Sequence, residues 1–157
     1  MTPANQQQTN GQLCPSAQPG MANCQVLGVM TEGEDGPRIS YLNQRLQVTD
    51  EVLAMAAPAK PTEVFRFAAT CEENKCTHFD GKDCQLAKRI VQIMPAVVGA
   101  LPPCIVRADC RWYRQEGGSA CLRCPQVSTL NYHPSQVLKV VAGPHAGPPQ
   151  FDNAIGR

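Results

Sequence analysis

The sequence predicts a small, loop-rich, mainly α domain with little β structure, stabilised by metal and preceded by a flexible N-terminal arm. Three observations predict this fold class. Hydrophobic residues make up 43% of the 157 residues but aromatic residues only 5%, so the core is thin for this length. The 14 prolines and 12 glycines indicate much turn and loop. Seven of the nine cysteines fall between Cys71 and Cys124, which favours a metal–thiolate centre.

The composition divides the chain into three parts. We expect residues 1–37 to form a flexible or extended arm, because the beginning of this range is rich in Gln, Asn, Pro, Gly and Ser and cannot bury enough apolar surface to offset the entropy of ordering. Residues 38–142 form the cysteine-rich metal-binding domain, with a thiol core over residues 71–124. Residues 143–157 form an irregular C-terminal tail.

Local patterns within this domain predict short elements. Thr49 can cap a helix over residues 50–57, because two acidic residues follow it at the positive end of the helix dipole. Three further elements are expected, one strand-like segment and two helices: 63–67, 84–93 and 134–142. In the strand-like segment two phenylalanines flank Arg66, so both rings lie on one face of the strand.

The seven clustered cysteines read C-x4-C-x7-C and, after a gap, C-x5-C-x10-C-x2-C. They are Cys71, Cys76, Cys84, Cys104, Cys110, Cys121 and Cys124. Disulfides are one interpretation, but the cysteine count is odd and the N-terminus lacks the basic and apolar regions of a secretory signal. Zinc is a second interpretation, with one ion held by two short hooks, 71–76 and 121–124. With one zinc ion bound in this way, three of the seven clustered cysteines are not ligands.

Iron–sulfur chemistry is the third interpretation and the preferred one, because a cubane accepts ligands from widely and irregularly spaced loops. The hook Cys121-x2-Cys124 followed by Pro125 resembles the C-P that ends ferredoxin cluster runs, although the compact ferredoxin run is absent and no family fold is implied. Cys104, Cys110 and this hook supply four thiolates for one [4Fe–4S] site. Nearby arginines can offset the negative charge of a cluster: Arg111, Arg114 and Arg123.

The first group, residues 71–84, offers three thiols, so a second [4Fe–4S] cluster needs a fourth ligand. His78, Cys14 and Cys24 are candidates for this place. An iron without a protein ligand is the remaining alternative, and such an open iron can bind a substrate or a partner. The sequence leaves these choices open.

Other classes of function have little support. The formal net charge of +1 gives no strong nucleic-acid signal, although the loop from Arg107 to Arg123 is locally basic. No stretch reaches the roughly 20 apolar residues that span a bilayer, and we expect a cytoplasmic protein. Motifs for nucleotide binding, serine hydrolases and zinc proteases are absent. Catalysis is therefore left unassigned, and a non-catalytic role is favoured.

The predicted function is that of an iron–sulfur protein with one or two [4Fe–4S] clusters. It carries electrons to a protein redox partner, or holds a cluster as an accessory subunit of a larger enzyme complex. The alternative is a zinc-stabilised binding or scaffold module without a redox role, in which the basic loop is the partner surface.

Overall fold

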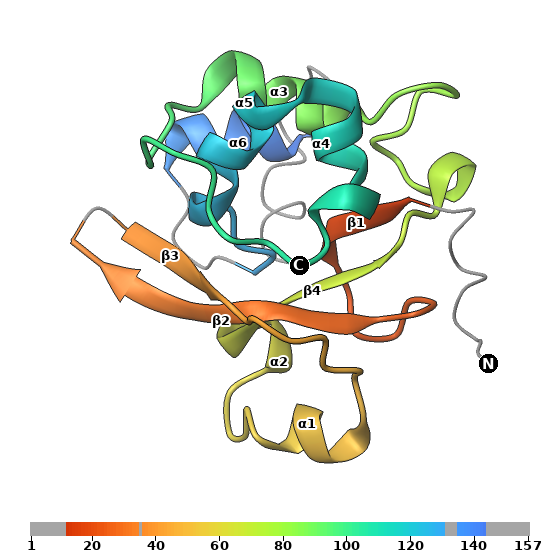
Figure 1. Ribbon diagram of the computed structural model, residues 1–157, viewed down its shortest axis with the longest axis vertical. Helices are drawn as coiled ribbons and strands as arrows, with labels where there is room; N and C mark the ends of the chain where they lie inside the picture. The colour runs from red at the N-terminus through yellow and green to blue at the C-terminus, as the bar shows by residue number, and fades with distance from the viewer. Residues whose placement is uncertain (1–11, 35, 131–134, 144–157) are drawn as a thin grey trace.

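The chain folds around a curled, four-stranded antiparallel sheet (Figure 1). The computed structural model describes residues 12–34, 36–130 and 135–143. The strand order is β1-β4-β2-β3. The strands are β1 (Leu13–Ala17), β2 (Gln25–Gly33), β3 (Gly36–Tyr41) and β4 (Phe65–Thr70).

The prediction of a mainly α domain with little β structure is wrong, because the chain is 24% strand and 36% helix, an α/β fold. The first four residues of β2 are all buried, since elements cover both faces of the sheet there. Such a strand lacks the alternation of apolar and polar residues that marks a half-buried strand. The range predicted as a flexible arm, residues 1–37, holds β1 and β2 and the start of β3. Composition misses β1 because its partner, β4, lies more than fifty residues further along the chain.

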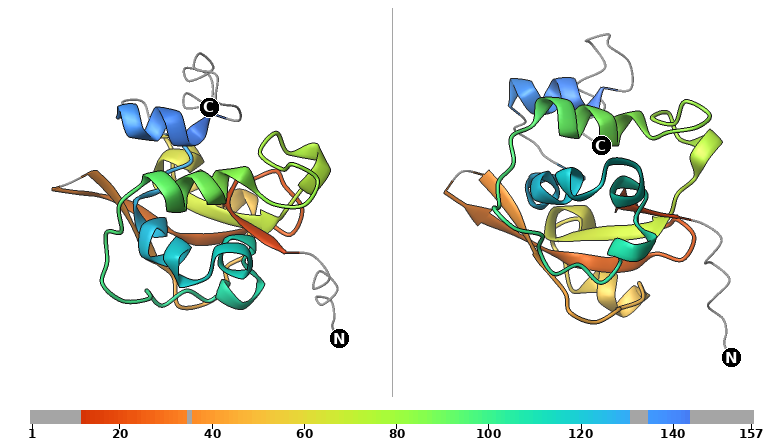
Figure 2. Two further views of the ribbon diagram at one scale, coloured as in Figure 1. Left: turned by 90° about the horizontal axis from the view of Figure 1, so that it is seen from above. Right: turned by 45° about the horizontal axis from the view of Figure 1, so that its top comes forward.

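Helices lie on both sides of the sheet (Figure 1). On one side are α1 (Asp50–Ala54) and α2 (Pro61–Val64), and on the other are α3 (Gln85–Ile93), α4 (Arg111–Glu116), α5 (Gly118–Arg123) and α6 (Gln136–Ala142). Figure 2 shows α3 and α6 side by side, with α4 and α5 between them and the sheet. Within the described part of the chain, no helix is long and apolar enough to cross a membrane.

Several local predictions are confirmed. Thr49 caps α1 by accepting a hydrogen bond from the backbone N–H of Val52 at 3.2 Å. The helix expected over 84–93 is α3, with Cys84 as its N-cap. Short 3-10 turns complete the chain: η2 (Glu73–Lys75), η3 (Arg107–Asp109) and η4 (Cys124–Gln126). Apart from Gly143, the predicted tail over 143–157 lies outside the described residues.

Side chains on the two faces of the sheet pack into two different hydrophobic cores. Phe65 and Phe67 pack together with α1, their ring centroids 6.0 Å apart, as the alternation around Arg66 predicts. Leu27 and Ala68 point to the opposite face and pack with Val106. A third core lies among α3 to α6 around Trp112. The side chain of Arg66 therefore points away from the phenylalanines, toward the helices.

Gly28 allows β2 and β3 to approach each other closely. A Cβ atom added there would lie 2.5 Å from the backbone oxygen of Ser40 and 2.6 Å from Ile39 Cγ1. We expect Gly28→Ala to destabilise the protein by about 1–3 kcal/mol, the typical cost of overpacking. Gly20→Ala is the matched control, because nothing lies within 4 Å of its added Cβ. Thermal unfolding of both variants checks this, and equal melting temperatures would contradict it.

Candidate metal centre

Four cysteines line one open cavity of about 660 Å³ at the edge of the sheet. We call these residues the first thiol site: Cys14, Cys71, Cys76 and Cys84. Cys14 lies on β1, Cys71 directly follows β4, Cys76 follows η2, and Cys84 caps α3. The site therefore gathers three cysteines of one sequence group and one from the N-terminal strand.

Strand pairing brings Cys14 to this group. Cys14 is paired with Ala69 in the antiparallel β1–β4 ladder, and the N–H of Cys71 donates to the carbonyl of Gln12 at 2.7 Å. A bridge between Phe79 and Cys84 closes the turn over residues 80–83, just before α3 begins. Pairing between residues more than fifty positions apart thus completes a set of four thiols.

N–H groups surround the sulfurs of the first thiol site. Backbone N–H groups of Ser16, His78 and Ala87 donate to Cys14, Cys76 and Cys84 at 3.4–3.5 Å. The fourth sulfur, that of Cys71, accepts a bond of 3.1 Å from Arg111 Nε. The same guanidinium lies 2.7 Å from the carboxylate of Glu73, so its charge is offset.

The thiols of this site act on one another. Burial raises the pKa of the Cys14 thiol, the N–H of Ser16 opposes this, and the negative charges of Cys84, Cys71 and Cys76 raise it further. Burial also raises the pKa of Cys84, with smaller contributions from Cys76 and Cys71. Several thiolates in one cavity repel each other, and a bound cation removes this repulsion and favours the deprotonated form.

The other four clustered cysteines line a second, smaller cavity of about 20 Å³. We call them the second thiol site: Cys104, Cys110, Cys121 and Cys124. Cys110 caps α4, Cys121 lies in α5, and Cys124 begins η4. This volume holds about one water molecule, so a larger group enters only if these side chains move apart.

Arg66 lies against the second thiol site and has 0% of its surface exposed. Its guanidinium donates to the carbonyls of Pro15, Cys124 and Val127 at 2.6–3.1 Å, and its Nη2 donates to Cys124 Sγ at 2.8 Å. None of the ion pairs among the described residues includes Arg66. A buried charge is costly without an opposite charge, and in this structure thiolate sulfur can supply that charge.

Burial and neighbouring charges shift several pKa values at the second thiol site. Burial by itself lowers the pKa of Arg66, but the charges of Cys124 and Tyr41 outweigh it and raise the pKa. Burial raises the pKa of Cys110 to about 12, with the charges of Cys124 and Cys104 adding to the effect. Arg107 faces Cys121, whose charge helps to raise the pKa of that guanidinium against the effect of burial.

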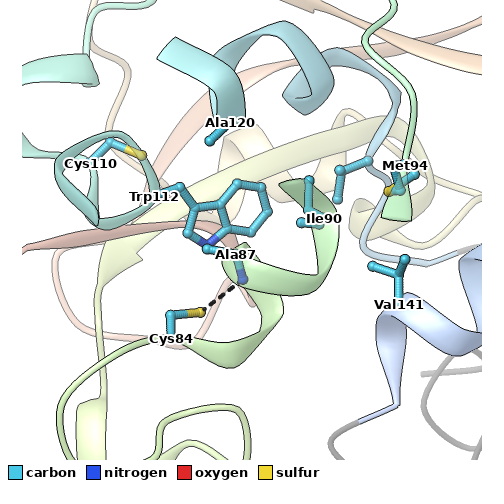
Figure 3. Packing of buried hydrophobic residues seen from close by; sticks show 9 residues of the cluster. Cys84, Ala87, Ile90, Met94, Cys110, Trp112, Ala120 and Val141 are labelled. Atoms are coloured by element: carbon cyan, nitrogen blue, oxygen red, sulfur yellow. Dashed lines mark hydrogen bonds between the residues drawn. The ribbon is translucent and has the colours of Figure 1, made fainter. Parts of the chain in front are cut away.

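Trp112 separates the two sites and lines both cavities, with 1% of its surface exposed. Figure 3 shows its indole ring between Cys110, of the second site, and Cys84, of the first. The guanidinium of Arg66 lies 5.7 Å from the centre of this ring. Strand β1 also lies between the two cavities, since its residue Cys14 lines the first cavity and the next residue, Pro15, lines the second.

Three buried side-chain atoms in the described ranges have no hydrogen-bond partner: Arg107 Nε, Trp112 Nε1 and Ser128 Oγ. All three are groups that can donate. Trp112 and Ser128 line the first cavity, and Trp112 and Arg107 line the second. Orphaned donors are rare in folded proteins and often mark a bound group. A group bound in either cavity would therefore meet unpaired donors among the described residues there.

Over the described residues, no three or more His, Cys, Asp or Glu side chains are arranged to hold a single metal ion. A tetrahedral zinc site needs its sulfurs within about 2.3 Å of one point. A cubane presents a separate iron to each of its four cysteines, so its thiolates do not converge in this way.

The seven cysteines proposed from the sequence all line one of the two cavities, divided three and four. Of the candidate fourth ligands, Cys14 joins them, whereas Cys24 lies in the core beside α1 and His78 lines the first cavity with its Nδ1 2.9 Å from Arg89 Nη2. Arg111 contacts a thiol, whereas Arg114 and Arg123 bond to backbone carbonyls elsewhere.

Sequence reasoning missed Arg66 as a site residue. The sequence does indicate the direction of this side chain, because a charged residue between two buried phenylalanines of a strand must point to the opposite face of the sheet. The sequence does not show that this face is also buried.

In comparisons with known proteins, no family model, no curated protein and no solved structure matches this chain.

Proposed function

We propose that this chain is an iron–sulfur protein that binds two [4Fe–4S] clusters, one at each thiol site, and carries electrons. It does so either alone or as a cluster-bearing subunit of a larger enzyme complex. The observation that carries this proposal is the division of eight of the nine cysteines into two sets of four, each around its own cavity. Four cysteine thiolates are the usual complement of one [4Fe–4S] cluster.

Each thiol site has four cysteines, enough to bind every iron of one cluster, and this favours electron transfer over catalysis at iron. When bound, a cluster supplies a one-electron couple whose potential the protein tunes. Cys14 provides the fourth thiolate that the group over residues 71–84 lacks. Each iron would then have a protein ligand, so no coordination position stays open for a substrate.

The surroundings of the sites fit an anionic cluster. A [4Fe–4S] cluster with four thiolates carries net negative charge and accepts N–H hydrogen bonds at its sulfurs. Arg66 offers such a site a buried positive charge without a carboxylate partner. The orphaned donors of Trp112, Ser128 and Arg107 offer hydrogen bonds in the same places.

The two cavities differ in how ready they are for a cluster. The first, at about 660 Å³, has room for a four-iron cluster and is open to entry. The second, at about 20 Å³, must widen around its thiols. We therefore expect the first site to load earlier when the protein is reconstituted.

Anaerobic reconstitution with iron and sulfide tests the proposal. We expect a brown protein with about eight iron and eight sulfide per chain, four of each per cluster. Protein purified without oxygen should show the same broad visible absorption. A colourless protein that binds zinc stoichiometrically and no sulfide would overturn the proposal in favour of a zinc-stabilised scaffold, and a protein that binds neither would overturn both.

A further inference from the structure

We propose that Arg89 is a positioning residue of the first thiol site, which ties the loop that carries Cys76 to α3 and to α6. The inference rests on the proposed function, because it concerns how firmly the first site holds its cluster. It does not depend on what the second thiol site binds. Two hydrogen bonds of one guanidinium, and its charge beside Cys84, carry the proposal.

The Arg89 side chain connects three parts of the wall of the first cavity. It extends from α3, where it lies half-buried. Its Nε donates to the carbonyl oxygen of Val141 in α6 at 2.7 Å. Its Nη2 lies 2.9 Å from His78 Nδ1, and because a guanidinium can only donate, this ring nitrogen is the acceptor. Since His78 and Val141 both line the first cavity, the two bonds span its wall from the loop to α6.

His78 in turn contacts the surroundings of two cysteines of the first thiol site. Its backbone N–H donates to Cys76 Sγ at 3.4 Å, and its carbonyl accepts from the N–H of Gln85 at 2.7 Å. Gln85 is the first residue of α3 and directly follows Cys84, the N-cap. A contact that holds His78 in place therefore helps to fix Cys76 and Cys84 relative to each other.

The charge of Arg89 also acts on the first site. Burial lowers the pKa of this guanidinium, and the negative charge of Cys84 opposes that effect. None of the ion pairs among the described residues includes Arg89, whereas the other guanidinium at this site, that of Arg111, is paired with Glu73. A cluster held by four thiolates carries net negative charge, so a loaded first site would offer Arg89 an opposite charge.

Removal of these contacts should speed the release of iron from the first site. Arg89 contacts the loop and not the metal, and loss of an outer contact of this kind typically weakens metal binding about 10–100-fold. In anaerobic protein, Arg89→Gln should therefore lose the iron of the first site to bathophenanthroline, with ascorbate present, about 10–100 times faster than wild type. That iron is identified as the part that Cys14→Ala does not bind.

Lys88→Gln is the matched control for this release. Lys88 is the neighbouring cation on α3, is paired with Asp83 at 3.4 Å, and is not among the described residues that line the first cavity. The control should release its iron at the wild-type rate. Equal acceleration in both variants would show a general effect of charge on α3 and would overturn the positioning role.

A partner variant separates positioning from general destabilisation. His78→Gln removes the ring that accepts from Arg89, so it should also speed release. Because both side chains belong to one contact, the double variant should release iron no faster than Arg89→Gln alone. Arg89→Lys keeps the charge but has one donor nitrogen in place of two, so it should restore only part of the retention. Additive effects in the double variant, or full restoration by lysine, would overturn the positioning role.

Hydrogen exchange of the cluster-free chain gives a readout that needs no iron. The N–H groups of Phe79 and Gln85 donate to the carbonyls of Cys76 and His78. In Arg89→Gln both should exchange about tenfold faster, because a hydrogen bond from a charged group is lost beside them. The amides of the β2–β3 ladder should not change. Unchanged exchange at Phe79 and Gln85 would overturn the inference. Failure of every variant and of the wild type to bind iron and sulfide would overturn the proposed function instead, so the two failures are distinguishable.

Discussion

Replacing Cys14 by alanine should lower the iron and sulfide content of the reconstituted protein to about half, from about eight to about four of each per chain. Cys14 is the one cysteine of the first thiol site that comes from the N-terminal strand, and the pairing of β1 with β4 places it there. Without it, three thiolates remain around an open cavity, and a cubane with an unprotected iron is readily lost. Iron and sulfide analysis after anaerobic desalting gives the measurement.

Cys24→Ala is the matched control for this loss. Cys24 is the ninth thiol, and it is buried in the core beside α1, away from both cavities. Burial raises its pKa to about 11, which is typical of an inert structural thiol. The control should keep the full content of iron and sulfide. If it loses half while Cys14→Ala keeps all, the division of the thiols proposed above is wrong.

Trp112→Ala should cause a large loss of stability together with a loss of cluster from both sites. The ring is fully enclosed, is the largest fully buried side chain of the described residues, and packs against Ile90, Ala87 and Ala120. Removing a buried aromatic ring typically costs about 3–5 kcal/mol. For a chain of this length, such a loss lowers the melting temperature by roughly 10 °C.

Trp112→Phe separates the packing role of this ring from its hydrogen-bonding role. Phenylalanine keeps most of the apolar contact but removes the indole N–H, which has no partner within the described protein. We expect the melting temperature of Trp112→Phe to lie well above that of Trp112→Ala, while its bound clusters are released faster. Melting followed by circular dichroism checks the first expectation. A Trp112→Ala protein that melts within a degree or two of the wild type would contradict the central place of this ring.

Local chemistry in the sequence predicts part of the structure correctly. Thr49 with its two acids predicts the start of α1, and the apolar spacing after Cys84 predicts α3, because both signals lie within a few residues. The second thiol site is also local, since its four cysteines fall within 21 residues. Patterns of this kind depend only on neighbours along the chain.

The sheet and the first thiol site depend on distant pairings. The segment of β1 contains a proline and sits in a stretch rich in polar residues, so its composition does not predict a strand. It becomes one because β4 pairs with it. The same pairing places Cys14 in the first thiol site, whereas composition predicts that it lies in a flexible arm. Arg66 shows a similar limit, because its side chain is buried against Cys124 and Val127, some sixty residues further along the chain.

An anomalous scattering map, from a crystal grown without oxygen and measured at the iron absorption edge, tests the two-cluster proposal most directly. We expect two strong iron peaks on the two sides of Trp112, one surrounded by Cys14, Cys71, Cys76 and Cys84 and the other by Cys104, Cys110, Cys121 and Cys124. Absence of iron from both cavities, or a signal at the zinc edge from single ions bound there, would contradict it.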